Sequence, residues 1–447
     1  MLVRFAVQNF RSFCEQTEIS MVANGHLSRL KHHTMEFNAV KLLKGAYVYG
    51  ANAAGKSNLI KAVDFACSLI KDGSADRLRY DQYNKVCERC SKEPGVFQFE
   101  ILIDQKVYSY GFAFSYLDGT IAEEWLYELY SSGGERCIFS RDLKGNVTHG
   151  LNLSKLERTK FNVYAEGIDS LPKNLFLSEV ARTKQKGQLT IFNDIFSWFE
   201  KVIVILPDSQ FGSLPLILEN EEMRKMFELH LPYFDTGIEG LKVERTTLER
   251  ATSHLGGKAA DILQKSFLQK LDKEKEFAVR IPGALLAFKR TDDGELHVDK
   301  LALQHGDAYE TFELNEESDG TQRLFDLIPL LFLDLKNRVV FVDEIDRSMH
   351  PTLTAEFVSL FYKSTKNENV QLIATTHESS LLDLGKVRRD EIWFVERLNK
   401  GSKLFSLDDF KVRYDKQIEK DYLLGRYGAI PLFSSFDSFQ EGDDFND

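Results

Sequence analysis

The sequence has few cysteines, no long apolar run and no excess of positive charge. Its 447 residues include five cysteines, at positions Cys14, Cys67, Cys87, Cys90 and Cys137. An odd and sparse set in a long chain is typical of reduced thiols in the cytoplasm. No apolar run reaches the roughly 18 residues of a transmembrane helix, so no membrane partner is expected. The first thirteen residues alternate apolar and polar side chains, which predicts a strand rather than a signal peptide.

The net charge of −11 disfavours a protein whose whole surface binds nucleic acid. A composition of 43% hydrophobic and 28% charged residues is that of an average soluble domain, which excludes collagen, a coiled-coil rod and wholesale disorder. Local contacts with nucleic acid stay open, although basic clusters are usually solvated faces. Two such clusters are present: Arg77, Arg79, Lys85, Arg89 and Lys92, and Lys386, Arg388 and Arg389.

The apolar pattern predicts an α/β protein. Residues 46–50 form a short apolar segment before a glycine-rich loop, and residues 57–70 have the pattern of the helix that follows. Residues 97–130 alternate with period two, and turn residues at 118–119 and 133–134 predict an antiparallel β meander. Residues 338–342 and 370–376 are mostly apolar, as expected for parallel strands buried on both faces.

The length suggests roughly three domain-sized units, and the pattern changes along the chain in that way. We expect an N-terminal lobe with the glycine-rich loop and the β meander (1–184). A helical insertion (185–285) is expected to follow, because residues 218–231 and 247–276 are mostly helical in pattern and rich in charge. A C-terminal lobe with the returning α/β pattern follows (286–433). The acidic tail 434–447 is expected to be disordered, either inert or a docking segment.

The glycine-rich loop, residues 50–57, fits the pattern G-x-x-x-x-G-K-[ST] of a P-loop. Its glycines, Gly50 and Gly55, let consecutive backbone N–H groups point at a phosphate, and the helix that follows adds the positive end of its dipole. Lys56 is expected to reach the β- and γ-phosphates of ATP, and the hydroxyl of Ser57 to bind Mg²⁺. The alternative is a glycine-rich turn without a ligand.

A P-loop needs an acidic partner, and the apolar strand 338–342 ends in Asp343 and Glu344. In open α/β sheets ligands bind at the carboxyl ends of strands. Asp343 would hold Mg²⁺ through water, and Glu344 could polarise the attacking water as a general base. The next apolar strand ends in His377, which is placed to contact the γ-phosphate unless it is a structural histidine.

A second anion site is predicted where Ser318 precedes a helix that opens at Gly320. A hydroxyl and free backbone N–H groups meet at such a helix N-terminus, which suits a phosphate. The same pattern also fits an ordinary helix cap.

Cys87 and Cys90 have the spacing of two zinc ligands, but no second pair follows, so ordinary thiols on a surface loop are the favoured interpretation. No nuclease pattern stands out in the sequence.

These motifs together resemble the ABC-type ATPase heads of the Rad50, RecF and structural-maintenance-of-chromosomes group. Within that group the chain looks most like the stand-alone AAA15 branch, which is related to the overcoming-lysogenization-defect proteins. The resemblance covers about 1–180 and 290–430. It rests on the first-strand motif 9–13, the P-loop with Asn52 and Asn58, the signature-like segment 317–321, Asp343-Glu344, Asp346 at the D-loop position, His377 as the switch histidine, and the late segment 425–431.

The resemblance implies an ABC-type head with a mixed sheet around the P-loop, and a homodimer or higher oligomer with ATP held at its interface. Arg11 and Ser12 would approach the nucleotide, as would Asn52, Asn58 and Asp346. Each site would combine Lys56, Ser57, Asp343, Glu344 and His377 of one chain with Ser318 and Gly320 of the other. The signature departs from the full Leu-Ser-Gly-Gly-Gln form, and a Q-loop glutamine is not obvious, with Gln98 the nearest candidate.

Chains of the AAA15 branch are often found in bacterial phage-defence gene pairs. The resemblance therefore implies a sensor and scaffold ATPase that controls a separate effector protein, commonly a nuclease, since no Toprim nuclease domain is expected after Gly428. The alternative is a DNA repair or maintenance ATPase that clamps DNA directly. A transporter subunit fits less well, because the P-loop context and the late segment do not look like that branch.

Overall fold

The computed structural model describes residues 1–447 except 39, 78–79, 208–213, 282–283, 292, 411–417 and 431–447. The chain divides into two compact units. The first unit contains Met1–Val204, Lys336–Ile345 and Glu368–Asp447, and the second contains Ile205–Leu335 and Asp346–Asn367. This division differs from the expected boundaries, because residues 286–335 group with the insertion rather than with the C-terminal lobe. The expected disordered tail 434–447 lies outside the described residues.

A six-stranded sheet of the first unit carries the P-loop. Its order is β11-β16-β17-β5-β18-β19. Pairing is parallel from β16 through β17 and β5 to β18, and β18 pairs antiparallel with β19. The two apolar segments predicted as buried parallel strands are β16 and β17. The strands span Val202–Ile205 (β11), Arg338–Val342 (β16), Val370–Thr375 (β17), Gly45–Gly50 (β5), Ile392–Leu398 (β18) and Gly401–Ser406 (β19).

A seven-stranded sheet contains the predicted N-terminal strand and the predicted meander. Its order is β10-β9-β8-β7-β6-β1-β2, and its strands pair antiparallel. Gly119 and Gly133, at the predicted turns, have positive φ angles of 74° and 87°. The strands are β1 (Leu2–Gln8), β2 (Thr17–Ser20), β6 (Gly95–Ile103), β7 (Lys106–Phe114), β8 (Ile121–Leu129), β9 (Glu135–Arg141) and β10 (Val147–His149), and a small hairpin joins β3 (Thr34–Glu36) to β4 (Lys41–Leu43).

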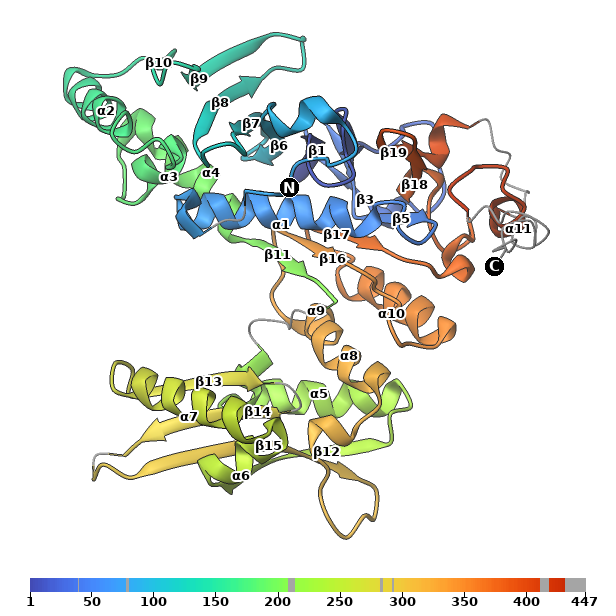
Figure 1. The fold of residues 1–447 in the computed structure, drawn as a ribbon. Helices are drawn as coiled ribbons and strands as arrows, with labels where there is room; N and C mark the ends of the chain where they lie inside the picture. The colour runs from blue at the N-terminus through green and yellow to red at the C-terminus, as the bar shows by residue number, and fades with distance from the viewer. Residues whose placement is uncertain are drawn as a thin grey trace, which may run out of the picture. The chain divides into compact units, whose positions relative to one another are not determined.

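Helix α1 (Lys56–Asp72) follows the P-loop and packs between these two sheets (Figure 1). It contacts β5 and β17 of the six-stranded sheet. Phe65 stacks on Phe97 of β6 with ring centroids 5.2 Å apart, and meets Phe114 of β7 edge-on at 5.4 Å. The helix therefore buries apolar side chains on both sides, which fixes the direction of its N-terminus. The unit also contains α2 (Lys155–Ile168), α3 (Phe176–Ala181), α4 (Thr190–Glu200) and α11 (Ile418–Leu423).

One buried amide joins the two sheets directly. Gln371 of β17 is fully buried, and its Oε1 accepts a hydrogen bond from the backbone N–H of Leu2 at 2.7 Å. Its Nε2 donates to the carbonyls of Leu2 and Leu43 at 2.9 and 3.0 Å. A polar residue in a fully buried strand thus satisfies the backbone of β1 and β4, because buried polar groups require partners.

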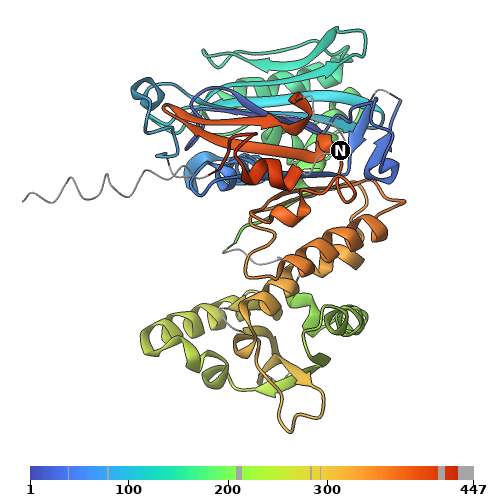
Figure 2. The same cartoon turned by 90° about the vertical axis from the view of Figure 1, so that its right-hand side faces the viewer.

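The second unit is not purely helical. Helices α6 (Leu248–Thr252) and α7 (Gly257–Leu271) cover a four-stranded antiparallel sheet of order β12-β15-β14-β13 (Figures 1 and 2). The expectation of a helical insertion over 185–285 therefore missed β11, β12, β13 and the start of β14. The other elements are α5 (Glu221–Tyr233), β12 (Ile238–Thr246), β13 (Glu276–Ile281), β14 (Ala284–Arg290), β15 (Leu296–His305), α8 (Asp319–Leu327), α9 (Pro329–Phe332) and α10 (Pro351–Ser364).

The missed strand β12 has a physical reason. It is an edge strand, and only Ile238 and Leu241 of its nine residues are buried. Charged side chains fill most of its other positions, so no clear period-two pattern exists to be detected. Across both units, none of the helices in the described residues is long and apolar enough to cross a membrane.

Glu124 of β8 anchors the meander to the helices that follow it. Its carboxylate is fully buried and accepts hydrogen bonds from Tyr110 Oη at 3.0 Å and from the backbone N–H groups of Phe176 and Leu177 at 2.6 and 2.9 Å. Burial raises the pKa of Glu124 to about 7, because a low-dielectric environment disfavours the charged form.

Glu124→Gln is expected to remove a pH dependence of stability. A carboxyl whose pKa is raised on folding stabilises the protein below its unfolded pKa near 4.5, and this contribution is lost as the pH rises through about 7. The unfolding free energy of the variant minus that of the wild type should therefore rise by up to about 3 kcal/mol from pH 4.5 to pH 8. Urea unfolding followed by circular dichroism measures this difference. Glu123→Gln, at an exposed neighbouring position, is the control, and an identical pH profile for both variants would contradict the assignment.

Candidate nucleotide site

The P-loop has a backbone that only glycine permits at two positions. Gly55 has φ of 117°, in the left-handed region, and a Cβ there would lie 2.5 Å from Ser402 Oγ and 2.6 Å from Ser12 Oγ. A Cβ on Gly50 would lie 2.5 Å from the carbonyl oxygen of Val395 in β18. The loop is thus held closely by β18, β19 and the first-strand motif, and its curl leaves backbone N–H groups at the start of α1.

Lys56 lies inside the curl of the loop. Its side chain is buried, and Nζ donates to the carbonyl oxygens of Gly50 at 2.8 Å and Ala51 at 3.2 Å. The same ammonium lies 3.4 Å from Nδ1 of His377, which follows β17 and is exposed. The structure therefore brings together two predicted catalytic residues that are more than 300 positions apart in the sequence. Ser57, the next residue of α1, is half-buried, and Asn52 is exposed on the loop.

Parallel pairing brings the acidic residues to the same edge of the sheet. Val342 pairs with Ala374, and Thr375 pairs with Val48, so β16, β17 and β5 end at neighbouring positions. Asp343 and Glu344 follow β16 directly, and the carboxyl end of β5 is the start of the P-loop. This edge is where ligands bind in open α/β sheets.

Thr375 positions both acidic residues, a role that the sequence analysis did not predict. Its Oγ1 donates to Oδ1 of the fully buried Asp343 at 2.6 Å. The same oxygen accepts the backbone N–H of Glu344 at 2.7 Å. Glu344 is half-buried and has a φ of 50°, an uncommon backbone for a residue with a Cβ. A threonine two residues before a candidate histidine at a strand end was the available signal.

The first-strand motif borders a cavity next to the P-loop. Ser12 Oγ accepts from Asn58 Nδ2 at 2.8 Å, which joins the motif to α1. Arg11 is exposed and has a φ of 50°, and its backbone N–H donates to the carbonyl of Gln82 at 2.6 Å. The cavity has a volume of about 400 Å³ and is lined by Arg11, Ser12, Asn58, Asp81, Gln82, Tyr83, Lys85 and Val86.

The signature-like residues belong to the second unit. Ser318 is the N-cap of α8, and its Oγ accepts the backbone N–H of Thr321 at 3.1 Å. A Cβ on Gly320 would lie 2.5 Å from the carbonyl oxygen of Ser348, so glycine lets the start of α8 approach this backbone. Asp346 lies in the same turn as Ser348, and its carbonyl accepts the N–H of Met349 at 3.1 Å.

Other polar candidates have structural partners. Gln98 lies within β6, where its Nε2 donates to Ser109 Oγ at 3.0 Å. His33 is buried 2.9 Å from Glu391, and burial raises the pKa of that carboxyl. Arg388, expected on a solvated face, is instead buried against Asp390 at 2.7 Å and the carbonyl of Arg29 at 3.0 Å. Cys87 and Cys90 were expected to be unremarkable thiols on a surface loop, but Cys90 is buried.

The comparison with protein families identifies the class of protein. Residues 46–149 and 228–383 match the family described as AAA domain, putative AbiEii toxin, Type IV TA system. These segments make up more than half of the chain and include the P-loop, Ser318, Asp343, Glu344 and His377. The chain therefore belongs to this family of AAA-domain ATPases. No curated protein matches the chain.

Solved structures that match include structural-maintenance-of-chromosomes heads. The SMC head domain from Thermotoga maritima is 13% identical, with 91% of this chain and 98% of that chain covered and a TM-score of 0.37. An SmcHead bound to the C-winged helix domain of ScpA has 13% identity, 91% and 99% coverage and a TM-score of 0.35. A Pyrococcus furiosus Smc head domain bound to the C-terminal domain of ScpA has 13% identity, 91% and 97% coverage and a TM-score of 0.32.

Gly55→Ala is expected to weaken nucleotide binding without unfolding the protein. The new Cβ would meet two serine hydroxyls at a positive φ, and strain of this kind costs about 1–3 kcal/mol, or roughly a tenfold to hundredfold loss of affinity. Titration with a fluorescent ATP analogue measures the loss. Gly25→Ala is the control, because a Cβ there has no neighbour within 4 Å. Unchanged affinity in Gly55→Ala would show that the loop does not hold the phosphates.

Proposed function

We propose that the chain binds and hydrolyses ATP as an ABC-type ATPase with Mg²⁺. The observation that carries this proposal is the convergence at one sheet edge of the P-loop lysine, Asp343 and Glu344, held by parallel pairing and by Thr375. Membership of an AAA-domain family supports the same reaction. The chain carries an ammonium, a hydroxyl and two carboxylates there, which are the groups that phosphoryl transfer to water requires.

Each residue has a distinct role in this proposal. Lys56 exchanges its contacts with Gly50 and Ala51 for phosphate oxygens, since an ammonium prefers an anion to a carbonyl. Glu344 accepts a proton from the attacking water, and His377 contacts the γ-phosphate. Arg11, Ser12, Asn52 and Asn58 border the nucleotide, and the 400 Å³ cavity beside them is the candidate place for its nucleoside part.

The residues present fit a magnesium ion. Ser57 supplies a hydroxyl at the start of α1, and Asp343 supplies a carboxylate whose Oδ1 is fixed by Thr375. Oxygen donors of this kind are the ligands that Mg²⁺ prefers. When bound, Mg²⁺ would neutralise charge on the phosphates. The hydrogen bond from Thr375 holds the Asp343 carboxylate in one orientation. Its other oxygen could therefore face Mg²⁺ without a change of side-chain rotamer.

The proposed working form is a homodimer or larger assembly in which ATP lies between two chains. The support is the cap of α8, where Ser318 and the N–H groups of a helix N-terminus form an anion-binding arrangement. Ser318 and Gly320 of one copy would contact the γ-phosphate held by Lys56 of the other, with Asp346 at the interface. Hydrolysis would then loosen the dimer, because the bridging phosphate favours only the closed state.

We infer that this ATP-dependent switch controls a separate effector protein, a nuclease in bacterial anti-phage defence, in the cytoplasm. The family description names a toxin of a type IV toxin–antitoxin system, which supports action in a gene pair. The net charge of −11 speaks against an extended nucleic-acid-binding surface. A DNA repair or maintenance ATPase that clamps DNA directly is the alternative, and it makes a different prediction in the experiment with Glu344→Gln below.

Two inactive variants are expected to restore each other if the sites are shared between chains. Lys56→Ala removes the phosphate contact, and Ser318→Asp retains the helix cap but repels the γ-phosphate. A mixed dimer of these two variants has one complete site. A 1:1 mixture should therefore hydrolyse ATP at roughly a quarter of the wild-type rate, because half of the dimers are mixed and each has one of two sites intact. Phosphate release measures the rate, and a mixture as inactive as its components would exclude the shared site.

Glu344→Gln is expected to bind ATP and slow its hydrolysis by about 10²- to 10⁴-fold, since it lacks the general base. The variant should then trap the ATP-bound complex in its native host. Affinity purification with ATP, followed by mass spectrometry and nucleic-acid staining, identifies what is bound. A stoichiometric protein without DNA supports effector control, and Lys56→Ala, the matched control, should not retain it. Bound DNA alone, released steeply by salt, would instead support the DNA clamp.

A further inference from the structure

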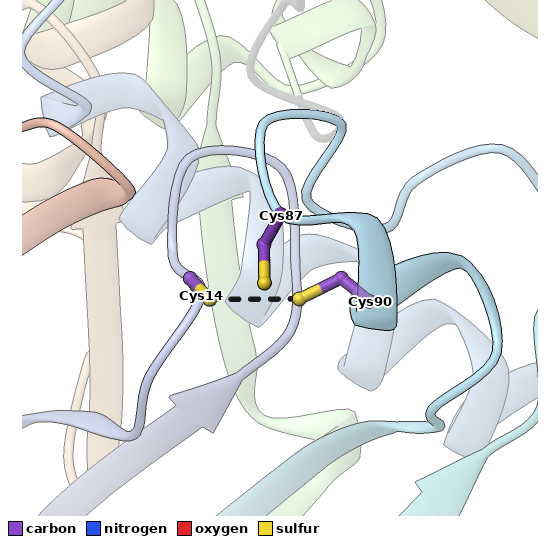
Figure 3. A group of neighbouring side chains, drawn as sticks. All are labelled: Cys14, Cys87 and Cys90. Atoms are coloured by element: carbon purple, nitrogen blue, oxygen red, sulfur yellow. Dashed lines mark hydrogen bonds between the residues drawn. The ribbon is translucent and has the colours of Figure 1, made fainter.

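Three cysteines from two distant segments converge in the first unit. Cys14 follows the first-strand motif, whereas Cys87 precedes the short 3-10 helix Glu88–Ser91 in the loop before β6 and Cys90 lies within that helix. Figure 3 shows the three sulfurs pointing toward one another. The sulfurs all lie within 4.8 Å of each other, and Cys14 Sγ is 3.6 Å from Cys90 Sγ. Within the part of the chain that the structure describes, no other group of three or more such ligand side chains converges in this way.

The spacing of the sulfurs suits a metal ion better than a disulfide. Zinc binds thiolate sulfur at about 2.3 Å, and tetrahedral angles then place two sulfurs roughly 3.8 Å apart. A disulfide requires about 2.0 Å and joins only two of the three sulfurs. All five cysteines of the chain are free thiols. Three sulfurs at these distances can therefore close on a single ion with small side-chain movements.

A backbone hydrogen bond and a nearby guanidinium order the cluster. The backbone N–H of Cys90 donates to the carbonyl of Cys87 at 3.1 Å, which turns both sulfurs to the same side. The guanidinium of Arg89 interacts with the sulfurs of Cys14 and Cys87 and also pairs with Glu15. Three thiolates around a divalent ion leave a net charge of −1, which this guanidinium offsets.

We propose that Cys14, Cys87 and Cys90 form a zinc site. The fourth ligand is an oxygen, from water or from Glu15, whose Oε1 lies 3.9 Å from Cys14 Sγ. Three protein ligands with one open or oxygen position is an established coordination for Zn²⁺. The Cys87-x-x-Cys90 pair alone did not predict the site, because the third ligand comes from a loop more than 70 residues earlier in the sequence.

The site would fasten one wall of the cavity beside the P-loop. Asn9 already ties the two segments, since its Nδ2 donates to the carbonyl of Cys90 at 2.8 Å and its Oδ1 accepts the N–H of Asn84 at 3.0 Å. Arg11 and Gln82 are joined by a backbone hydrogen bond of 2.6 Å. A bound ion would add a strong link between the same segments, and it would stabilise the first-strand motif through the folded state that it binds.

The test is the metal content of the full chain, purified and kept under a reductant. Inductively coupled plasma mass spectrometry should find one zinc per chain in the wild type. Cys14→Ser, Cys87→Ser and Cys90→Ser should each retain less than about a tenth of it, since each removes one of three ligands. Cys137→Ser, at a half-buried cysteine outside the cluster, is the matched control and should retain zinc.

A second measurement starts with the wild type, so its first part does not depend on the folding of any variant. A chelator should remove zinc from the wild type, lower its thermal midpoint, and allow recovery on addition of one equivalent of zinc. Replacement by Co²⁺ should give thiolate-to-cobalt charge-transfer bands that weaken in each cluster variant but not in Cys137→Ser. Lys56→Ala should keep its zinc while losing nucleotide, so failure of the zinc site and failure of the ATPase proposal give different results.

Three results would overturn the zinc site. The first is a wild-type chain that takes up no zinc after full reduction. The second is zinc retained in full by Cys14→Ser, which would reduce the site to the Cys-x-x-Cys pair. The third is a Cys14–Cys90 disulfide in peptide mass spectrometry together with no zinc uptake by the reduced chain, which would assign the cluster to thiol oxidation instead.

Discussion

The candidate site depends on the parallel pairing of three strands. β16, β17 and β5 end at neighbouring positions, so one sheet edge receives the P-loop, the acidic pair and His377 from three parts of the sequence. Parallel strands require crossovers, and the chain between β5 and β16 builds the meander and most of the second unit before it returns. The site therefore forms only when contacts far apart in the sequence are made. Local structure alone does not assemble it.

Side chains with no role in the proposed chemistry maintain this edge. Thr375 fixes Asp343 and the backbone of Glu344, and Gln371 of the same strand joins it to β1. Ser402 of β19 donates to the carbonyl of Ala54 and packs on Gly55, so the P-loop is braced from outside. Each contact pairs a polar group whose burial without a partner would cost free energy. The same contacts therefore stabilise the sheet and orient the residues of the site.

Much of the first unit could be predicted because its signals are local. Apolar runs marked β16 and β17, alternation marked the meander, and one motif marked the P-loop. The second unit gave weaker signals, since the edge strand β12 has only two buried side chains. Long-range pairs left no trace in the sequence: Thr375 and Asp343 are separated by 32 positions, and Arg388 reaches the carbonyl of Arg29 across 359 positions. Cys14 could not be predicted as a partner of Cys87 and Cys90 for the same reason. Rules based on ligand spacing compare neighbours in the sequence and not neighbours in space.

The contacts of Lys56 have a thermodynamic consequence. Its ammonium holds the carbonyls of Gly50 and Ala51, so the curl of the P-loop is maintained by the lysine that is proposed to contact phosphate. The entropy of ordering this loop is then lost during folding and not at the moment of binding. In the proposed function, an incoming polyphosphate would exchange one set of oxygen partners for another around an existing cation. Binding at such a preformed receptor is expected to be fast and to lack a slow conformational phase, leaving large rearrangements to later steps of the cycle.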